Sequence, residues 1–208
     1  MKKLFIAAIA VLSFATANAQ YVAEKGDFQA SVEFRPFNNG GQDMFNTVGF
    51  NAAYFVSDKD AIRARLNFGL KSREMMGAEN YVKFGIAAGY ERHFKTLDRV
   101  DVFGGGQVSF DMNSPKYFAT KTDGSLKKLK SGNETTFGVA AFTGVNFYVY
   151  KKLYVGAEIQ FAFETTSYGK PESYNAAKDE VTTPSDKPKS KVELAFKAIP
   201  ALKLGWTF

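Results

Sequence analysis

The sequence predicts an all-β fold: a closed, up-and-down antiparallel transmembrane β-barrel of eight strands that follows a cleaved signal peptide. Three observations support this prediction. Apolar and polar residues alternate with a period of two along most of the chain, as in strands whose two faces meet different surroundings. The alternating stretches are as long as the roughly 9–11 residues that a tilted strand needs to cross a bilayer, whereas strands of soluble proteins average about five or six. Short turns and long polar connections alternate between these stretches, as in barrels that span a membrane.

The N-terminal residues read as a secretory signal peptide. Two lysines precede an apolar stretch, residues 4–15, which is too short to span a bilayer comfortably as a helix, and residues 17–19 read Ala-Asn-Ala, a typical cleavage site. We therefore expect residues 1–19 to be removed and residues 20–208 to form one outer-membrane barrel domain. The alternative is an uncleaved membrane anchor.

The composition agrees with a β protein and narrows the possible functions. The chain contains 21 Phe, 18 Gly and only 6 Pro, and abundant aromatic residues with few prolines are typical of strands. Its formal net charge of +6 is mildly basic and does not by itself indicate a nucleic-acid partner. Cysteine is absent, which excludes a disulfide framework, thiol chemistry and a lipoprotein anchor.

The first four expected strands each carry one apolar face. Their opposite faces carry mostly glycine, polar and charged residues, so the two faces differ in character. The strands are expected at 27–36, 47–56, 61–71 and 81–94, with apolar faces from Phe28 to Phe34, Val48 to Val56, Ile62 to Leu70 and Val82 to Tyr90.

The last four strands continue the pattern and are expected at 99–110, 135–149, 153–164 and 191–208. The fifth contains Gly104-Gly105-Gly106, which indicates close packing or curvature rather than a phosphate loop, because no helix follows it. The eighth contains Pro200, which removes a hydrogen-bond donor, so we expect a bulge there. The short turns are expected at 57–60, 96–98 and 150–152, and the long loops at 36–44, 72–80, 112–133 and 166–190.

Side-chain volume predicts which face looks outward. An eight-stranded barrel is only wide enough for side chains or one small ligand, so we expect the bulky apolar face to meet lipid and the face of glycines and charges to line the lumen. Aromatic belts are expected at both interfaces. They comprise Tyr54, Tyr90, Tyr150, Tyr154, Trp206 and Phe208 at the short-turn rim, and Phe34, Phe68, Tyr81, Phe110 and Phe163 at the other.

The lumen face carries charges of both signs on neighbouring strands. Ions in a low-dielectric interior must be paired and hydrogen-bonded, or they cost several kcal/mol each. We therefore expect a paired network that fills the lumen, and we expect Arg63, Arg65, Glu91, His93 and Asp101 to meet at the short-turn side. The full predicted network is Glu33, Arg35, Arg63, Arg65, Glu91, His93, Asp101, Glu158, Lys197 and Lys203.

The sequence gives little support for a catalytic or a metal-binding site. His93 is the only histidine, and a lone histidine beside Arg and Glu is typical of a polar network rather than of a nucleophile–base pair. No cluster of Cys and His supports zinc, and no run of carboxylates has the spacing of a calcium loop. We therefore predict a protein that is not an enzyme and has neither a metal nor a cofactor.

The long loops contain the remaining candidate site. A basic patch of lysines lies in the loop at 112–133, just outside the expected bilayer, where it is suited to the phosphates of lipopolysaccharide or to a protein partner on the cell surface. A solvated, mobile loop is the simpler interpretation. The patch consists of Lys121, Lys127, Lys128 and Lys130.

The chain resembles the small eight-stranded outer-membrane barrels of Gram-negative bacteria, the OmpA-barrel and OmpX-like group. The resemblance covers the whole mature chain and rests on the signal peptide, the alternating strands, the loop pattern and the aromatic end, Trp206 and Phe208. It implies an outer-membrane location and recognition of that end by the barrel-assembly machinery. The match is partial, because Lys203 stands where the family usually has Gly and Gly205 directly precedes Trp206.

Members of this group differ in function, so the fold alone implies little about activity. Our first hypothesis is a non-enzymatic barrel with a filled, charged lumen and basic extracellular loops, serving envelope integrity or surface interaction. One alternative is a narrow, porin-like channel for ions or small solutes. The other is a soluble, lipocalin-like binder whose apolar face lines the lumen.

Overall fold

The computed structural model describes residues 22–35, 47–72, 80–94, 99–121, 123–175, 178, 180–183 and 191–208; of residues 47 and 191–198 only the backbone is described. The expected signal peptide, the turn at 96–98 and much of the loops at 36–44, 72–80 and 166–190 lie outside these residues. No helix in the described part of the chain is long and apolar enough to span a membrane.

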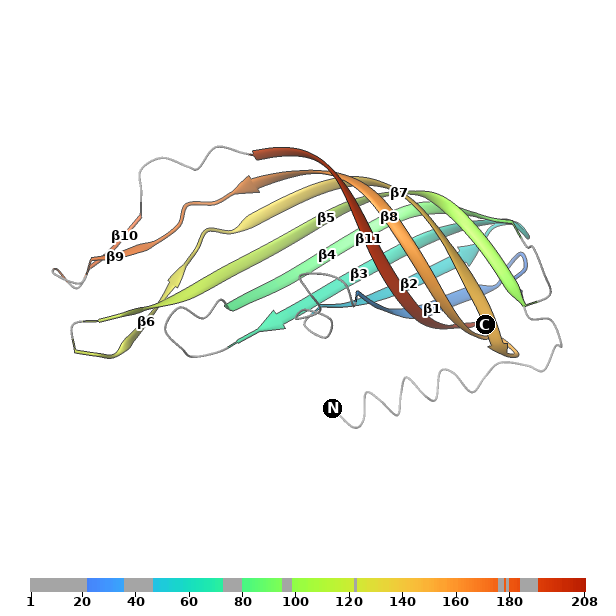
Figure 1. Ribbon diagram of the computed structural model, residues 1–208, viewed down its shortest axis with the longest axis horizontal. Coiled ribbons are helices and arrows are strands. Elements are labelled where there is room, and N and C mark those ends of the chain that lie inside the picture. Colours follow the sequence, from blue (N-terminus) through green and yellow to red (C-terminus); the bar gives the residue numbers. More distant parts are fainter. Residues whose placement is uncertain are drawn as a thin grey trace.

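Eight antiparallel strands close into a barrel, which confirms the predicted fold (Figure 1). Closure comes from pairing of the first strand with the last, where Val32 lies opposite Leu204, while Val32 also lies opposite Phe50 of the second strand. A closed barrel leaves no unpaired strand edge, which a lipid environment requires. The barrel strands are β1 (Phe28–Phe34), β2 (Thr47–Phe55), β3 (Asp60–Lys71), β4 (Asn80–His93), β5 (Val100–Thr120), β7 (Glu134–Tyr150), β8 (Leu153–Tyr168) and β11 (Lys191–Thr207).

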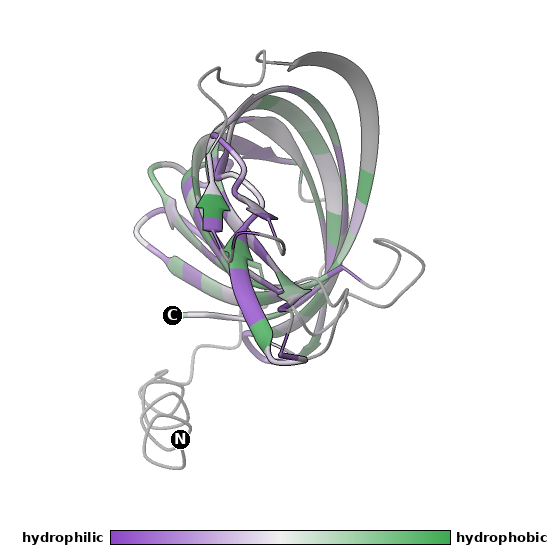
Figure 2. Ribbon diagram, turned by 90° about the vertical axis from the view of Figure 1, so that its left-hand side faces the viewer, coloured by the Kyte–Doolittle hydropathy of each residue, from purple (hydrophilic) through white to green (hydrophobic). Residues whose placement is uncertain are grey.

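The alternation of the sequence becomes an alternation of exposure along the barrel strands, as far as their side chains are described and up to about Met112 on β5. On β3, Ile62 and Leu66 are more than half exposed on the outer wall, whereas Arg63 is buried in the interior with 2 % exposure. Figure 2 shows the curved wall, with hydrophobic and hydrophilic residues alternating along the strands. The bulky apolar face therefore points outward. The alternative of a soluble, lipocalin-like binder, whose apolar face would line the lumen, is wrong.

Two predicted loops contain further strands. Residues 112–133 were expected to form a loop, but β5 continues to Thr120 and pairs with β6 (Leu126–Lys130). The loop at 166–190 likewise contains the end of β8 and a small hairpin of β9 (Ser173–Asn175) and β10 (Glu180–Thr182). Polar composition concealed these strands, because a strand that projects beyond the lipid has no apolar face to reveal its period. They lie at the end of the molecule opposite the C-terminus (Figure 1).

The expected bulge at Pro200 is wrong in its position. Pro200 lies in regular register opposite Ile159, and the register shift falls between Glu193 and Lys197. The Phe208 amide donates to the oxygen of Phe28, so even-numbered residues of β11 present their nitrogens to β1. Among the described residues, the pairing with β1 runs as far as Leu202, which lies opposite Phe34. The nitrogen of Pro200 points to the same side two residues beyond that pair, and proline has no N–H group to donate there.

The aromatic belts are only partly as predicted. Tyr54, Tyr90 and Tyr150 are about half exposed on the outer wall. Tyr81 and Tyr154 face inward instead, with 4 % and 3 % exposure, because each occupies a strand position of the inward parity.

The expectation that bulky residues do not fit the lumen is also wrong. Phe55, Phe103, Phe142 and Tyr148 are buried in the interior. Inward-facing glycines make room for these rings: a Cβ built on Gly105 would lie 2.8 Å from the ring of Phe142. The lumen thus combines rings and charges, and two of the rings, Phe103 and Phe142, lie opposite Gly144 and Gly105 on the neighbouring strands.

Candidate functional site

The most heavily built part of the interior is a cluster of ions around Glu158, which projects from β8. Arg63 of β3 donates two hydrogen bonds to it, from Nη1 to Oε2 at 3.1 Å and from Nη2 to Oε1 at 3.2 Å, and Arg65 donates a third from Nη2 to Oε1 at 3.1 Å. Lys203 of β11 also pairs with this carboxylate. Because β3 and β8 are not neighbours in the barrel, the arginines cross the lumen to reach it. All four side chains are nearly inaccessible.

A second carboxylate, Glu33 of β1, extends the cluster towards the long-loop side. Arg35 Nε lies 2.8 Å from Glu33 Oε1, and Arg65 Nε lies 3.5 Å from Glu33 Oε2. Asn51 donates from Nδ2 to Glu33 Oε2 at 3.0 Å and accepts from Arg65 Nε at 3.0 Å. Gln160 Oε1 accepts from Arg65 Nη1 at 3.1 Å. Arg65 thus bonds to two carboxylates and two amides.

On the short-turn side the cluster continues through a histidine held between two acids. His93 Nδ1 lies 2.7 Å from Asp101 Oδ2, and His93 Nε2 lies 3.2 Å from Glu91 Oε1. Glu91 Oε2 lies 3.4 Å from Arg63 Nη1, and this contact joins the triplet to the central cluster. The ring of Phe55 packs 4.7 Å from the imidazole, centroid to centroid. Both ring nitrogens are therefore occupied by carboxylates.

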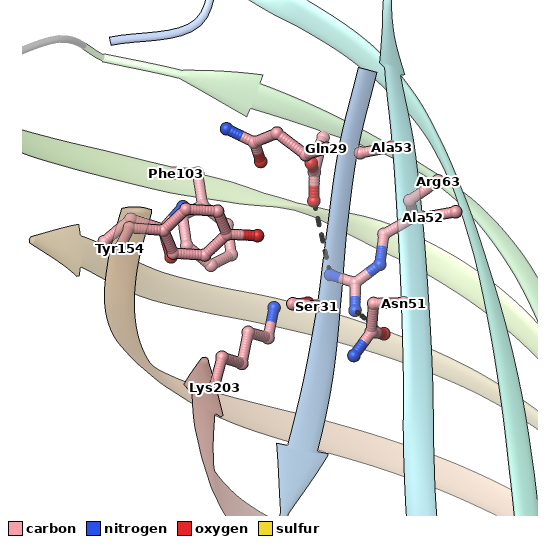
Figure 3. Close-up of a pocket in the computed structure, with 11 residues that line it drawn as sticks. Gln29, Ser31, Asn51, Ala52, Ala53, Arg63, Phe103, Tyr154 and Lys203 are labelled. Carbon is pink, nitrogen blue, oxygen red and sulfur yellow. Dashed lines mark hydrogen bonds and ion pairs between the residues drawn. The ribbon is translucent and has the colours of Figure 1, made fainter. Parts of the chain in front are cut away.

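Aromatic rings flank the cations on the remaining sides. The guanidinium carbon of Arg63 lies 4.0 Å from the ring centroid of Phe142, and Lys203 Nζ lies 4.8 Å from that of Phe103. Figure 3 shows Arg63 and Lys203 converging from two strands, with the rings of Phe103 and Tyr154 beside them. Cation–π contacts of this kind are stronger where water is excluded.

The cluster fills its section of the lumen. The cavity between Arg63, Lys203, Asn146 and Tyr154 measures about 20 Å³, which is room for about one water molecule. The ion cluster contains four buried acids and four cations, and His93 lies between two of the acids. The acids are Glu33, Glu91, Asp101 and Glu158, and the cations are Arg35, Arg63, Arg65 and Lys203. The arrangement suits a rigid plug, because each charge has a partner and little space remains.

The structure brings together nine of the ten side chains predicted for this network. The tenth, Lys197, lies opposite Ala162 in the β8–β11 ladder, but its side chain lies outside the described residues. The amides Asn51, Gln107 and Gln160 lie at inward positions of the same alternation and also belong to the network, although the predicted network named only ionisable residues. Gln107 donates to Gln160 Oε1 at 3.1 Å, and Gln160 donates to Glu158 Oε1 at 2.7 Å. The amides therefore bridge neighbouring members of the ion cluster.

The predicted basic patch is divided between two faces of the β5–β6 hairpin. Lys130 lies opposite Lys116, and Lys128 lies opposite Phe118, with Lys128 Nζ 5.8 Å from that ring centroid. These residues share the parity of Met112 on β5, which is exposed on the lipid-facing wall. The outward lysine face of the hairpin is therefore Lys116, Lys128 and Lys130.

The other two lysines lie elsewhere, and one was missed. Lys127 pairs with Ala119 on the face that carries buried Leu129. Lys121 belongs to the tip, where its carbonyl accepts from Gly124 at 3.0 Å. At the same tip, hydrogen bonds from Ser125 lower the pKa of Asp123. Lys116 escaped the sequence analysis because it precedes the lysine-rich segment and joins it only through strand pairing.

The hairpin is fixed to the rest of the extracellular end. Tyr117 donates its hydroxyl to the Glu172 oxygen at 2.6 Å, and Lys130 donates its amide to Glu172 Oε2 at 2.9 Å. Glu172 in turn donates its amide to the Lys130 oxygen at 2.8 Å. Leu129 is buried at 1 % exposure. The outward lysine face is thus presented on a supported strand pair.

The aromatic C-terminus is bound to the first strand up to the final residue. Trp206 lies opposite Ala30 of β1 and Leu153 of β8. Phe208 donates its amide to the Phe28 oxygen at 2.7 Å, and the two rings lie 6.2 Å apart. The terminal residues therefore belong to the closing seam.

Comparisons with known proteins agree with this architecture. The family model described as Putative OmpA-OmpF-like porin family matches residues 71–208. The outer membrane protein OprG of Pseudomonas aeruginosa has 12 % identity and a TM-score of 0.56, over 92 % of this chain and 99 % of that one. The outer membrane protein AlkL in DMPC bilayers has 15 % identity and a TM-score of 0.50, over 94 % and 95 % of the two chains. A search of the curated proteins finds no significant match.

At these identities the solved structures establish the fold alone, whereas the family match spans more than half of the chain. The closed barrel, its apolar outer wall and its polar interior are the features that such a family requires. The chain therefore belongs to the OmpA-OmpF-like porin family and is a β-barrel protein of the Gram-negative outer membrane.

Proposed function

We propose that this protein is a non-enzymatic, structural component of the outer membrane whose lumen is closed and whose outward lysine face binds lipopolysaccharide phosphates. The observation that carries the proposal is the ion cluster around Glu158, which joins β3, β8 and β11 across the lumen. A large pore needs an open section, and this section is filled by paired side chains.

The surroundings of His93 favour a structural over a catalytic role. Its two ring nitrogens are bound to Glu91 and Asp101, so neither is directed at a nucleophile. Ser57, in the turn between β2 and β3, donates its hydroxyl to Asp60 Oδ2 at 2.7 Å. The proposal therefore assigns the protein no enzymatic step and requires no metal or cofactor.

The position of the outward lysine face favours a lipid headgroup as its partner. The face continues the lipid-facing wall of β5 beyond Phe110 and Met112, so its ammonium groups point sideways over the membrane. Lysines near an anionic membrane surface each contribute about 1 kcal/mol to binding. The described acid paired with this face, Glu172, is 3.8 Å from Lys130 Nζ, and that lysine side chain is 64 % exposed. A protein partner on the cell surface is the competing possibility.

The closing seam supports a further part of the proposal, that Trp206 and Phe208 are recognised by the barrel-assembly machinery. Trp206 lies on β11, the strand that completes the barrel by pairing with β1, and Phe208 follows directly after this strand and bonds to Phe28. Recognition of this end before closure would couple the last strand to insertion.

The triple variant K116Q/K128Q/K130Q tests the headgroup proposal. Purified folded protein is mixed with phosphatidylcholine vesicles that contain lipopolysaccharide, and binding is measured at low and at high salt. We expect the variant to lose about tenfold or more of the wild-type affinity at low salt, because three charges near the surface are lost. In cells that lack the protein, expression of the variant is expected to reduce the uptake of a hydrophobic dye less than expression of the wild type does.

The matched control is K121Q/K127Q, which removes lysines from the same hairpin but not from the outward face. It should retain wild-type binding. Equal losses in the two variants would reduce the effect to net charge and contradict the assigned face. Unchanged lipopolysaccharide binding by the triple variant would overturn the headgroup role, and loss of cell-surface protein binding alone would favour a protein partner.

A further inference from the structure

Residues 22–27 precede β1, yet they do not extend away from the barrel. Val22 is 7 % exposed and Ala23 is fully buried. Ala23 packs with Ala53, Phe55 and Ala61, and these three residues occupy inward positions of β2 and β3. The chain therefore enters the lumen before it begins the barrel wall.

The preceding residue, Val22, contacts the opposite wall of the lumen. Val22 packs with Tyr148 and Tyr154, which face inward from β7 and β8. These rings and Phe55 form a cup at the short-turn end of the lumen, and the cup is occupied by Val22 and Ala23. In barrels of this kind the short turns face the periplasm, so the cup lies at the periplasmic mouth.

Polar contacts hold the segment against the rim. Gly26 donates its amide to the Phe55 oxygen at 2.8 Å, and Phe55 donates its amide to the Asp27 oxygen at 3.0 Å. The Lys25 amide donates to Asp58 Oδ1 at 3.1 Å. The Asp27 carboxylate lies 2.8 Å from Lys152 Nζ, in the turn between β7 and β8. Two turns on different parts of the rim therefore hold one short segment.

We propose that residues 22–27 form a latch that closes the periplasmic mouth of the barrel, as a second closure in series with the ion cluster around Glu158. The latch covers the acid–histidine triplet, because Phe55 contacts Ala23 on one side and the His93 ring on the other. When the latch is seated, water and solutes from the periplasm do not reach the triplet.

The latch is separable from the barrel wall. The contacts described for this segment include two buried small side chains, several hydrogen bonds and the ion pair of Asp27 and Lys152, whose side chains are 21 % and 15 % exposed. Segments with few buried contacts open locally at a fraction of the global unfolding free energy. The mouth can therefore open while the eight strands remain paired.

Cysteine labelling tests the latch directly, because the chain has no cysteine of its own. The variants A23C and E24C are prepared in the full-length mature protein, folded in detergent, and reacted with a membrane-impermeant maleimide. Residue 23 is buried and residue 24 is exposed, so we expect A23C to react at least tenfold more slowly than E24C. Equal rates in the two variants would overturn the proposal.

Release of the latch is tested in the A23C background. D27N removes the negative charge of the Asp27–Lys152 ion pair, and K152Q removes its positive charge. Each variant should therefore speed the labelling of A23C several-fold. K25A is the matched control, since only the Lys25 amide takes part in the contacts above. Slower migration of boiled than of unheated protein on a gel verifies that each variant is folded. Unchanged labelling in both D27N and K152Q would contradict the ion pair as the holding contact. The readout needs neither conductance nor lipopolysaccharide, so its failure is distinct from failure of the proposed function.

Discussion

At the scale of single residues, Glu158 is the centre of the interior. Its two oxygens receive Arg63, Arg65 and Lys203 from two strands. Breaking a buried ion pair by removing one partner is strongly destabilising, typically by 3–5 kcal/mol, because the other charge stays buried without compensation. Loss of this single carboxylate leaves three cations in that position.

We therefore expect E158Q to destabilise the folded barrel by about 3–5 kcal/mol. The amide keeps the shape of the side chain but not its charge. Samples are incubated at increasing temperature or urea concentration, and the measurement is the midpoint at which the fast-migrating band of the folded protein is lost on the gel. E180Q, at an exposed position of β10, serves as the control and should behave as wild type. A midpoint for E158Q equal to that of the control would show that the cluster contributes little to stability.

At the scale of elements, the glycine-rich part of β5 shows how strand parity determines what a glycine does. Gly105 faces the lumen, where an added Cβ would meet the Tyr90 oxygen and the ring of Phe142. Gly106 faces outward, where the nearest atom to an added Cβ is the Ala140 oxygen at 3.7 Å. Adjacent glycines of one triplet therefore have opposite roles: one admits an aromatic ring, and the other leaves space on the lipid-facing wall.

The two alanine substitutions should differ accordingly. G105A is expected to cost about 1–3 kcal/mol, the usual range for overpacking a filled interior. G106A should be neutral or slightly stabilising, because alanine loses less backbone entropy than glycine in a strand. Urea denaturation of the folded barrel, followed by gel mobility, compares them. Similar losses for both variants would indicate that the whole triplet, rather than Gly105 alone, requires glycine.

At the scale of the whole molecule, the barrel has two closures in series. The ion cluster fills the middle of the lumen, and the latch closes the periplasmic mouth. Closure of the wall by β1 and β11 is a separate matter and depends on backbone pairing up to the C-terminus. A solute that enters the lumen from the long-loop side would therefore meet the ion cluster first and the latch second.

This arrangement predicts that the wild-type protein does not conduct in planar bilayers. Current steps should be indistinguishable from those of a protein-free bilayer, because ions would have to displace paired charges in the lumen. Releasing the latch with D27N should leave the bilayer silent, since the ion cluster remains. Steady conductance by wild type that falls in R63Q or R65Q would instead favour a narrow channel through the charged lumen.

The sequence alone determined the class of fold and the two faces of its wall. A period of two, sustained over strands long enough to cross a bilayer, distinguishes lumen from lipid at each position because side chains alternate strictly across a strand. The inward parity of Arg63, Glu91 and Glu158 was readable in this way. The same rule, applied without exceptions, would have placed Tyr81 and Tyr154 inside.

Only the tertiary structure decided which inward residues meet. Arg63 and Glu158 lie 95 positions apart and on strands that are not neighbours, so their contact depends on the curvature and stagger of the closed barrel. The β5–β6 hairpin and the latch were hidden for a related reason: a polar strand beyond the lipid and a short segment before β1 have no periodic signal. Alternation assigns a side chain to a face, whereas its partner across the lumen exists only once the barrel has closed.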